Sequence, residues 1–186
     1  AIPGAPASAP VECCITNILD ISAAGTATRW YSDAGLTTLV GWGSPFATGQ
    51  TAAGTYPYYV TQTVNGCQSA GSATSLTISP LSVGGSISGS SSKCYGVSTG
   101  NLTLSGYTGT ITKWQKRVSA GAWNDIAFTG TVYSEIPSST GTWDYRAEVK
   151  SGSCSVAYSS TATVIVNPLP TPVITGNSVV CPGASG

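Results

Sequence analysis

Apolar and polar residues alternate in short runs along the whole chain. The clearest run places Trp143, Tyr145, Ala147 and Val149 at every second position, which is the spacing of a β-strand with one buried face. Gly, Ser, Asn and Pro separate these runs, and such residues form turns. No run has the spacing of an amphipathic helix. The pattern therefore predicts an all-β protein built from short strands.

An internal repeat divides the chain. The motif GTYPY at 54–58 returns as GTWDY at 141–145, an offset of 87 residues, and a cysteine follows nine residues after the last tyrosine of each motif. These cysteines are Cys67 and Cys154. Both repeats then end in an apolar strand that runs into a proline, in LTISPL and in VIVNPL. Because proline cannot donate to a strand ladder, we expect a module boundary at each of these positions.

The end of the chain repeats the start of the second module. The segment ITGNSVVCPG at 174–183 matches ISGSSSKCYG at 87–96, again at an offset of 87 residues. We therefore expect module 1 at residues 1–81 and module 2 at residues 82–168. Residues 169–186 are expected to hold a linker and the first strand of a truncated third module. Repeats of this kind form arrays, so the chain is expected to be part of a longer one.

About seven short strands in each module predict tandem immunoglobulin-like β-sandwich modules, stapled by disulfides. A sandwich needs large side chains between its two sheets, and we expect Trp30 and Trp114 to fill the two cores. The linkers SPLSVGG and NPLPTPV are short and contain proline. Neighbouring modules should therefore be held at restricted angles.

The cysteine content predicts disulfides and an extracellular location. The chain has six cysteines, no histidine and no CxxC pair, which argues against a zinc site. Disulfides form and persist outside the reducing cytosol. Cys181 falls in the repeat of the third module, so its partner is expected in the missing part of that module.

The remaining cysteines are expected to pair within modules, each bond tying the first strand of a module to the start of its last. On this hypothesis Cys94 pairs with Cys154, and Cys67 pairs with Cys13 or Cys14. Adjacent residues of a strand point to opposite faces, so only one of the two neighbours can reach Cys67. The sequence does not prove this connectivity.

Composition and charge exclude several classes of function. Seven basic and seven acidic residues give a net charge of zero and form no block, so no nucleic acid partner is expected. No apolar run approaches the roughly 18 residues of a membrane span, so no membrane insertion is expected. The carboxylates are scattered and match no catalytic or calcium-binding motif, so we expect no enzyme activity, metal or cofactor. Lys113, Lys116 and Arg117 flank Trp114, and we expect them to form a solvated sheet face.

Three longer motifs of module 1, RWYSDAG, GSPFATG and GTYPYYVTQTVNGCQS, resemble Ig-like and PKD-like repeat modules of large Bacteroidota cell-surface proteins. These proteins include gliding-motility adhesins exported by type IX secretion. Module 2 resembles a sister repeat through GGSISGSSSKCYG and GTWDYRAEVKSGSC. The resemblance implies display on a bacterial surface or adhesion, and no reaction. It also implies a single cysteine three residues after Val11, which favours Cys14 over Cys13 as the partner of Cys67.

We therefore expect a non-enzymatic extracellular segment of a large adhesin or stalk that acts as a semi-rigid spacer and adhesive array. Its partners would be neighbouring modules of the same chain. One alternative is a self-assembling filament subunit, in which residues 173–180 add a strand to another copy. Another is a glycan-binding accessory module of a secreted enzyme, contacting surface polysaccharide through exposed aromatic rings. The candidate rings are Trp42, Trp123 and Tyr95.

Overall fold

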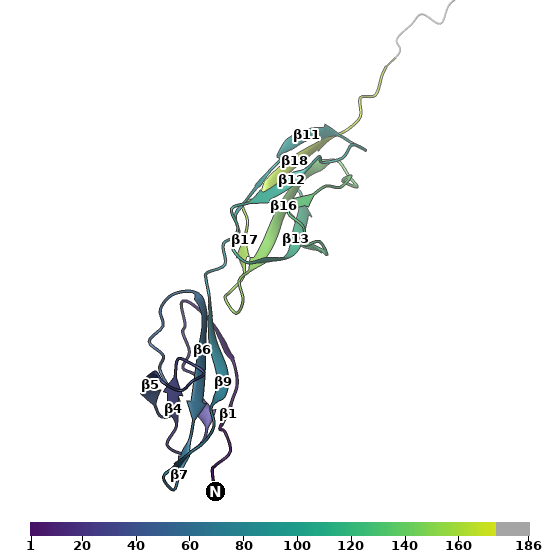
Figure 1. The fold of residues 1–186 in the computed structure, drawn as a ribbon. Helices are drawn as coiled ribbons and strands as arrows, with labels where there is room; N and C mark the ends of the chain where they lie inside the picture. The colour runs from purple at the N-terminus through teal and green to yellow at the C-terminus, as the bar shows by residue number, and fades with distance from the viewer. Residues whose placement is uncertain (174–186) are drawn as a thin grey trace, which may run out of the picture.

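Two β-sheet modules follow one another end to end in the computed structural model, which describes residues 1–173 (Figure 1). The strands of module 1 end at Ser79, and those of module 2 run from Ser86 to Asn167. No helix occurs among the described residues, so none of them forms a helix that could span a membrane. The predicted third module and the cysteine at position 181 lie outside the described residues.

Module 1 is a sandwich of one large and one small sheet. The large sheet has the strand order β2-β9-β6-β4-β5, and in it β2 runs parallel to β9. The small sheet pairs β1 with β3, and β7 with β8 forms a separate hairpin. The bounds are β1 Ala7–Ser8, β2 Val11–Cys14, β3 Ala23–Ala24, β4 Arg29–Tyr31, β5 Leu39–Trp42, β6 Gly54–Thr61, β7 Thr63–Val64, β8 Cys67–Gln68 and β9 Ser72–Ser79.

Module 2 repeats this topology. Its large sheet has the order β11-β18-β16-β13-β14, with β17 paired to β16, and its small sheet has the order β10-β12-β15. Again the first strand of the large sheet, β11, runs parallel to the last strand, β18. The bounds are β10 Ser86–Ser88, β11 Ser91–Cys94, β12 Leu102–Ser105, β13 Thr110–Val118, β14 Asn124–Ile126, β15 Val132–Tyr133, β16 Gly141–Lys150, β17 Ala157–Tyr158 and β18 Ala162–Asn167.

A fully buried tryptophan lies in the core of each module. Trp30 and Trp114 have no exposed surface, and each indole N–H donates to a backbone carbonyl, of Gly43 at 2.7 Å and of Gly130 at 2.9 Å. The alternating residues of β16 that the sequence pattern places on one face are all buried. Burial of the apolar face of each sheet is the main force that holds each module together.

The parallel pairing of the first and last strands fixes where each cysteine lies. Cys14 and Cys94 end β2 and β11, beside the ends of β9 and β18, at the pole where the chain leaves each module. Cys67 and Cys154 precede those last strands, at the opposite pole. A strand of eight residues, such as β9, is about 26 Å long at 3.3 Å per residue, whereas the Cα atoms of a disulfide lie within about 7 Å.

The expected disulfides within modules are therefore wrong. The structure bonds Cys14 to Cys154, across the boundary between the modules. Within residues 1–173, Cys67 and Cys94 are exposed free thiols, and Cys13 is a buried one. Cys14 is the bonded member of the adjacent pair, as the resemblance implied, but its partner belongs to the other module. Both in-module bonds would have to span the length of a sandwich.

Candidate functional site at the junction of the two modules

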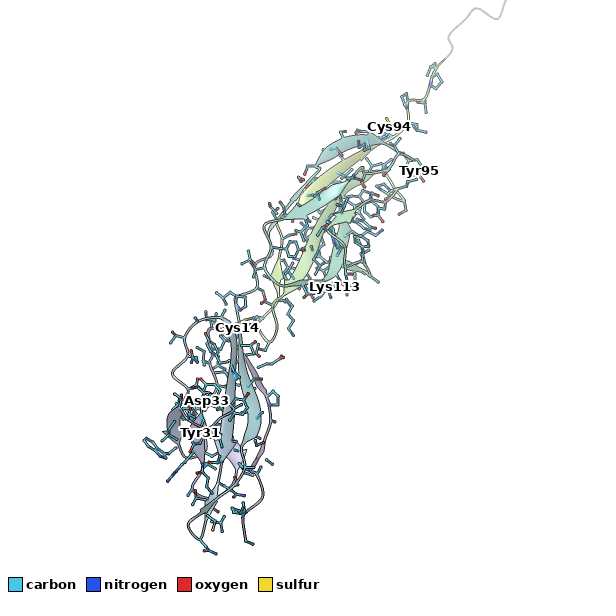
Figure 2. All side chains as sticks on the ribbon, viewed as in Figure 1. Cys14, Tyr31, Asp33, Cys94, Tyr95 and Lys113 are labelled. Carbon is cyan, nitrogen blue, oxygen red and sulfur yellow. A yellow bond between two sulfur atoms is a disulfide. The ribbon has the colours of Figure 1, made fainter. Side chains whose placement is uncertain are left out.

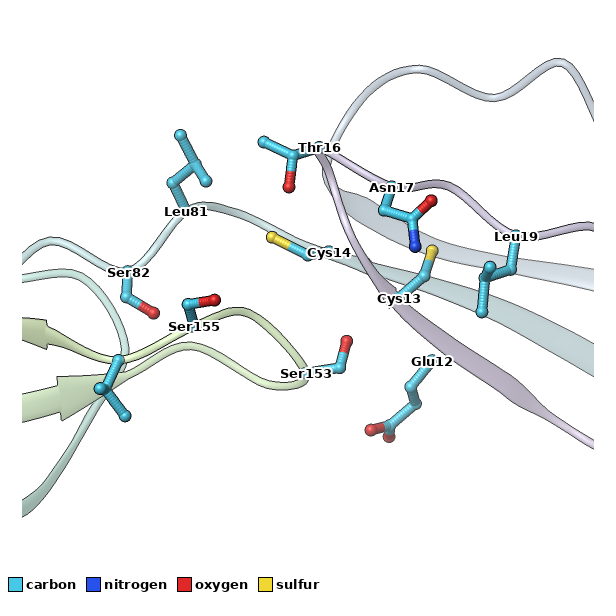
Figure 3. A pocket seen from close by; sticks show the side chains of 11 residues that line it. Glu12, Cys13, Cys14, Thr16, Asn17, Leu19, Leu81, Ser82, Ser153 and Ser155 are labelled. Atoms are coloured by element: carbon cyan, nitrogen blue, oxygen red, sulfur yellow. The ribbon is translucent and has the colours of Figure 1, made fainter.

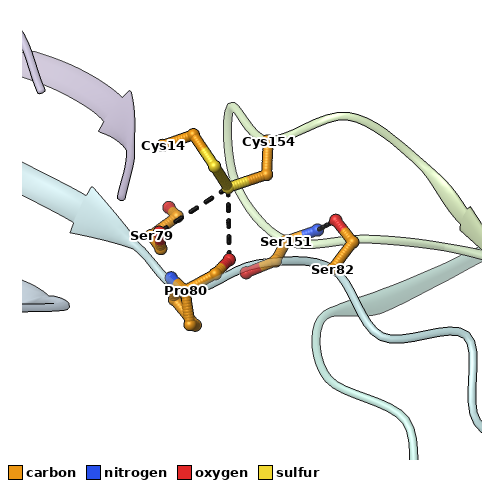
Figure 4. The surroundings of a disulfide bond; sticks show 6 residues. All are labelled: Cys14, Ser79, Pro80, Ser82, Ser151 and Cys154. Carbon is orange, nitrogen blue, oxygen red and sulfur yellow. Dashed lines mark hydrogen bonds between the residues drawn. A yellow bond between two sulfur atoms is a disulfide. The ribbon is translucent and has the colours of Figure 1, made fainter. Parts of the chain in front are cut away.

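The disulfide Cys14–Cys154 joins two segments that are 140 residues apart in the sequence. Cys14 is the last residue of β2, and Cys154 lies in the turn that follows β16 (Figure 4). The Cα atoms of the two cysteines are 4.7 Å apart. The bond thus fixes the turn of module 2 against the exit pole of module 1.

The turn around Cys154 is shaped for a close approach to the linker. The N–H of Cys154 donates to the carbonyl of Ser151 at 2.9 Å, and Gly152 has a positive φ of 47°. A Cβ on Gly152 would overlap the side chain of Ser79 at the end of β9. The absence of a side chain at Gly152 therefore lets the two modules touch at this point.

A direct hydrogen bond adds to the covalent contact. The N–H of Ser151 donates to the hydroxyl of Ser82 at 2.9 Å, and the sulfur of Cys154 lies 3.2 Å from the carbonyl oxygen of Pro80 (Figure 4). The second contact is not a hydrogen bond, because a disulfide sulfur carries no proton. Both contacts place the linker directly against the turn.

The linker itself is short because its later residues already belong to module 2. Val83 exchanges two backbone hydrogen bonds with Thr108, at 3.1 and 3.0 Å. Gly85 accepts a hydrogen bond from the N–H of Ser160 at 3.0 Å. Residues 80–82 are thus the only ones between the last strand of module 1 and the first backbone bonds of module 2 in the described chain.

A pocket of about 470 Å³ lies beside the disulfide (Figure 3). The residues that line it come from both modules and from the linker. They are Glu12, Cys13, Cys14, Thr16, Asn17, Leu19, Leu81, Ser82, Ser153, Ser155 and Val156. Histidine is absent from the sequence, and no cluster of three potential metal ligands occurs among the described residues. We interpret the pocket as the space left between the two modules and the linker where they meet.

Cys13 lines this pocket, but its side chain is buried in module 1. Only 3% of its surface is exposed, and it belongs to the core cluster that contains Trp30 and Ile21. The alternation of side chains along β2 explains why neighbouring cysteines have such different environments. Cys13 therefore acts as a small apolar core residue.

The three candidate ligand-contact aromatics lie at separate places. Trp42 ends β5 of module 1 and is 70% exposed. Tyr95 is half exposed and follows Cys94 at the far pole of module 2 (Figure 2). Trp123 is partly buried beneath two guanidinium groups, Arg117 at 4.5 Å and Arg146 at 4.2 Å from its ring centroid. The structure therefore does not gather them into one binding surface.

The basic residues near Trp114 are matched by carboxylates. Their nitrogen–oxygen distances are 2.9 Å for Lys113 to Asp125, 2.6 Å for Lys116 to Glu135 and 3.0 Å for Arg117 to Asp144. These pairs cross between strands and loops, which the sequence pattern alone did not show. The expectation of one solvated face holds only for Lys113 and Arg117, which lie on the face of β13 opposite Trp114 and are partly exposed. Lys116 lies on the same side of the sheet as Trp114, and its Nζ atom is 5.5 Å from the ring centroid of the buried Trp143. Because all three basic side chains are paired with carboxylates, they form no basic patch.

Glu135 holds two tyrosines at the edge of the module 2 core. Its carboxylate accepts hydrogen bonds from the hydroxyls of Tyr133 and Tyr145, each at 2.8 Å. Burial and the neighbouring negative charge raise the pKa of both hydroxyls well above the ordinary value of 10.0, because a second negative charge is disfavoured there. This cluster is structural, and no sequence pattern indicates it because Glu135 lies in a loop.

Module 2 should lose stability above pH 10. Unfolded tyrosines ionise near the ordinary value of 10.0, whereas folded Tyr133 and Tyr145 stay neutral there. A group whose pKa is higher in the folded state than in the unfolded state stabilises the fold at pH values below its unfolded pKa. This stabilisation is lost as the pH rises toward the folded pKa. For Tyr145 alone the slope is about 1.4 kcal/mol per pH unit above pH 10. Urea unfolding of module 2 between pH 8 and pH 11 measures how the free energy of unfolding changes with pH. Tyr145→Phe should make this dependence weaker. The same pH dependence in the Tyr145→Phe variant would contradict the raised pKa of Tyr145.

Comparisons with known proteins agree with the two-module architecture. Residues 3–80 match the family model described as "Ig-like domain CHU_C associated". Residues 83–168 match another, described as "Domain of unknown function (DUF8696)". A comparison with curated protein sequences finds no match.

Among solved structures, the chain is similar to the I-band fragment I67–I69 from titin. The TM-score is 0.51 at 14% identity, and the match covers 89% of this chain and 67% of the titin fragment. The fold is an immunoglobulin-like β-sandwich. Fibronectin(III)-like modules of Clostridium thermocellum CbhA match 90% of this chain and 96% of their own, at 12% identity and a TM-score of 0.41. Immunoglobulin-like modules with a disulfide are consistent with a non-enzymatic extracellular repeat segment.

Proposed function

We propose that this chain is a semi-rigid spacer within a longer extracellular surface protein, in which a disulfide between adjacent immunoglobulin-like modules fixes their relative orientation. The observation that carries the proposal is the bond between Cys14 and Cys154. A disulfide inside a module would stabilise that module only. A disulfide across the boundary acts on the arrangement of the modules.

Two attachments at one junction restrict the relative motion of the modules more than a single attachment does. The linker at residues 80–82 alone would act as a hinge about which module 2 could swing. The disulfide attaches module 2 at a second point, on the turn that follows β16. The hydrogen bond from Ser151 to Ser82 and the contact of Gly152 with Ser79 lie between these attachments. Together they oppose bending and rotation at the junction.

A rod that holds its length suits display at a distance from a cell surface. The setting implied by the sequence resemblance, a bacterial adhesin or stalk at the cell surface, is part of this proposal, and repetition of modules would convert weak contacts along the rod into avidity. Trp42 is the exposed ring best placed to contact a surface polysaccharide, because it is the most exposed aromatic residue of the three candidates. The filament alternative depends on residues 173–180, nearly all of which lie outside the described residues.

Loss of the disulfide should broaden the distribution of distances between the modules. Cys67 and Cys94 are exposed free thiols within the described chain, so both accept spin labels in a Cys181→Ser background. We expect a narrow distance distribution by double electron–electron resonance in the oxidised protein. The double variant Cys14→Ser/Cys154→Ser, labelled at the same two sites, should give a clearly broader one. Equal widths would refute a spacer held rigid by this bond.

A further inference from the structure

Cysteines occupy two structural positions, and both positions recur in each module. We define the exit-pole cysteine as the one that ends the first strand of the large sheet, Cys14 in module 1 and Cys94 in module 2. We define the turn cysteine as the one that follows the second-to-last long strand, Cys67 in module 1 and Cys154 in module 2. The observed disulfide joins the exit-pole cysteine of the first module to the turn cysteine of the next.

The two cysteines left over form the complementary half of this arrangement. Cys94 is an exit-pole cysteine and Cys67 is a turn cysteine, and among residues 1–173 both are free and exposed. They lie at opposite ends of the two-module unit. Cys94 is at the far end of module 2, and β7, which precedes Cys67 in the chain, is near the N-terminus (Figures 1 and 2). They therefore cannot bond to each other within one molecule.

The exit pole of module 2 has the same local construction as the exit pole of module 1. Cys14 is paired in register with Ser79, and Cys94 is paired in register with Asn167. In both cases the sequence continues with Pro-Leu, at 80–81 and at 168–169. The surface that receives the turn of module 2 at the observed junction is thus repeated at the far end.

The turn of module 1 also matches the turn of module 2. At the repeat offset of 87 residues, Asn65 with a φ of 48° stands where Gly152 has a φ of 47°, and Gly66 stands where Ser153 does. The two turns thus share a positive φ at the same position, although module 1 carries an asparagine side chain where Gly152 has none. A Cβ on Gly152 would meet Ser79, whereas a Cβ on Gly66, next to Cys67, would meet no atom within 4 Å. The turn of module 1 is therefore uncovered on the side of Gly66.

We propose that Cys67 and Cys94 are docking sites for further modules of the same kind. Cys94 would bond the turn cysteine of a module that follows, and Cys67 would bond the exit-pole cysteine of a module that precedes. Each junction would then carry one disulfide of the type seen between Cys14 and Cys154. This inference rests on the proposed function, since it extends the rigid junction along an array.

Formation of each bond requires a two-electron oxidant. The S–H bonds of the two cysteines break, a sulfur–sulfur bond forms, and two protons and two electrons leave. Oxidised glutathione accepts them, and its own disulfide is reduced to two thiols. The reaction is the same one that forms the bond between Cys14 and Cys154, so a single redox buffer serves both.

A tandem chain tests both cysteines in one bond. Residues 1–168 are joined directly to a second copy of residues 1–173. This design leaves six residues between Pro168 and Ala7 of the second copy, the same number as between Pro80 and Ile87. Cys67→Ser in the first copy and Cys94→Ser in the second remove the two outer thiols. The protein is refolded in a glutathione redox buffer and mapped by non-reducing peptide mass spectrometry.

We expect three disulfides in the tandem chain. Two are the Cys14–Cys154 bonds of the copies, and the third links Cys94 of the first copy to Cys67 of the second. A further Cys94→Ser substitution in the first copy should remove only the third bond and leave Cys67 of the second copy open to alkylation. The proposal is overturned if both Cys14–Cys154 bonds form while the inner Cys94 and Cys67 remain alkylatable. That result would leave the rigid spacer intact, because the observed junction would still be bonded.

Discussion

Cys154→Ser lowers the free energy of unfolding of module 2 by about 4 kcal/mol, with module 1 still folded. When module 2 unfolds beside a folded module 1, the disulfide closes a loop from the end of β9 at Ser79 to Cys154, about 75 residues. The chain-entropy model gives about 3 kcal/mol for a loop of 15 residues and about 4.7 kcal/mol for one of 100. In a domain of this size, 4 kcal/mol lowers the Tm by roughly 15 to 30 °C. Differential scanning calorimetry without reductant measures the change.

Matched serine variants of the other cysteines distinguish the observed bond from the pairings within modules. Cys14→Ser should be as destabilising as Cys154→Ser, because it removes the same bond. Cys94→Ser and Cys67→Ser should change the stability of the two-module chain by no more than about 0.5 kcal/mol, as is usual for exposed side chains, because both cysteines are free thiols within the described chain. If Cys94→Ser instead lowered the Tm as much as Cys154→Ser does, the assignment of the disulfide to Cys14 and Cys154 would be wrong.

The strands and the modules could be predicted from the sequence, because both depend on local spacing. Alternation along β16 indicates a strand wherever that strand is placed, and the repeat at an offset of 87 residues needs only the comparison of GTYPY with GTWDY. The burial of Trp30 and Trp114 follows from the need to fill a sandwich, and the structure places both in the cores.

The connectivity of the cysteines could not be read in the same way. It depends on which pole of the sandwich each cysteine occupies, and that depends on the parallel pairing of β2 with β9 and of β11 with β18. Spacing along the chain does not carry this information. A usable signal was nonetheless present, since Cys14 ends a first strand and Cys67 precedes a last strand. Strand direction would have placed these two cysteines at opposite ends.

The side-chain clusters on module 2 could not be predicted from the sequence, for a related reason. Arg146 contacts Trp123 at 4.2 Å and Tyr158 at 3.9 Å from the ring centroids, and these three residues come from different segments. Glu135 reaches Tyr145 from a loop. Such contacts depend on strand register, which a local pattern does not specify.

Trp114→Ala should lower the free energy of unfolding of module 2 by about 3 to 5 kcal/mol, the range for removal of a large buried side chain. Trp114 is fully buried, and its ring packs against Tyr133 and Phe128 at centroid distances of 5.6 and 6.4 Å. The substitution also removes the donor to the carbonyl of Gly130. Thermal unfolding followed by far-UV circular dichroism measures the loss without relying on tryptophan fluorescence.

Trp42→Ala is the matched control, because Trp42 is 70% exposed and the same number of atoms is removed. It should change stability by no more than about 0.5 kcal/mol. The two variants also test whether the modules fold as separate units. The buried clusters of modules 1 and 2 contain no residue in common, so Trp114→Ala should lower the transition of module 2 and leave that of module 1 in place. A downward shift of both transitions by the same amount would mean that the disulfide and the short linker couple the unfolding of one module to that of the next. In an array, such coupling would let the loss of one core release several modules, whereas independent modules would confine the damage to one position along the rod.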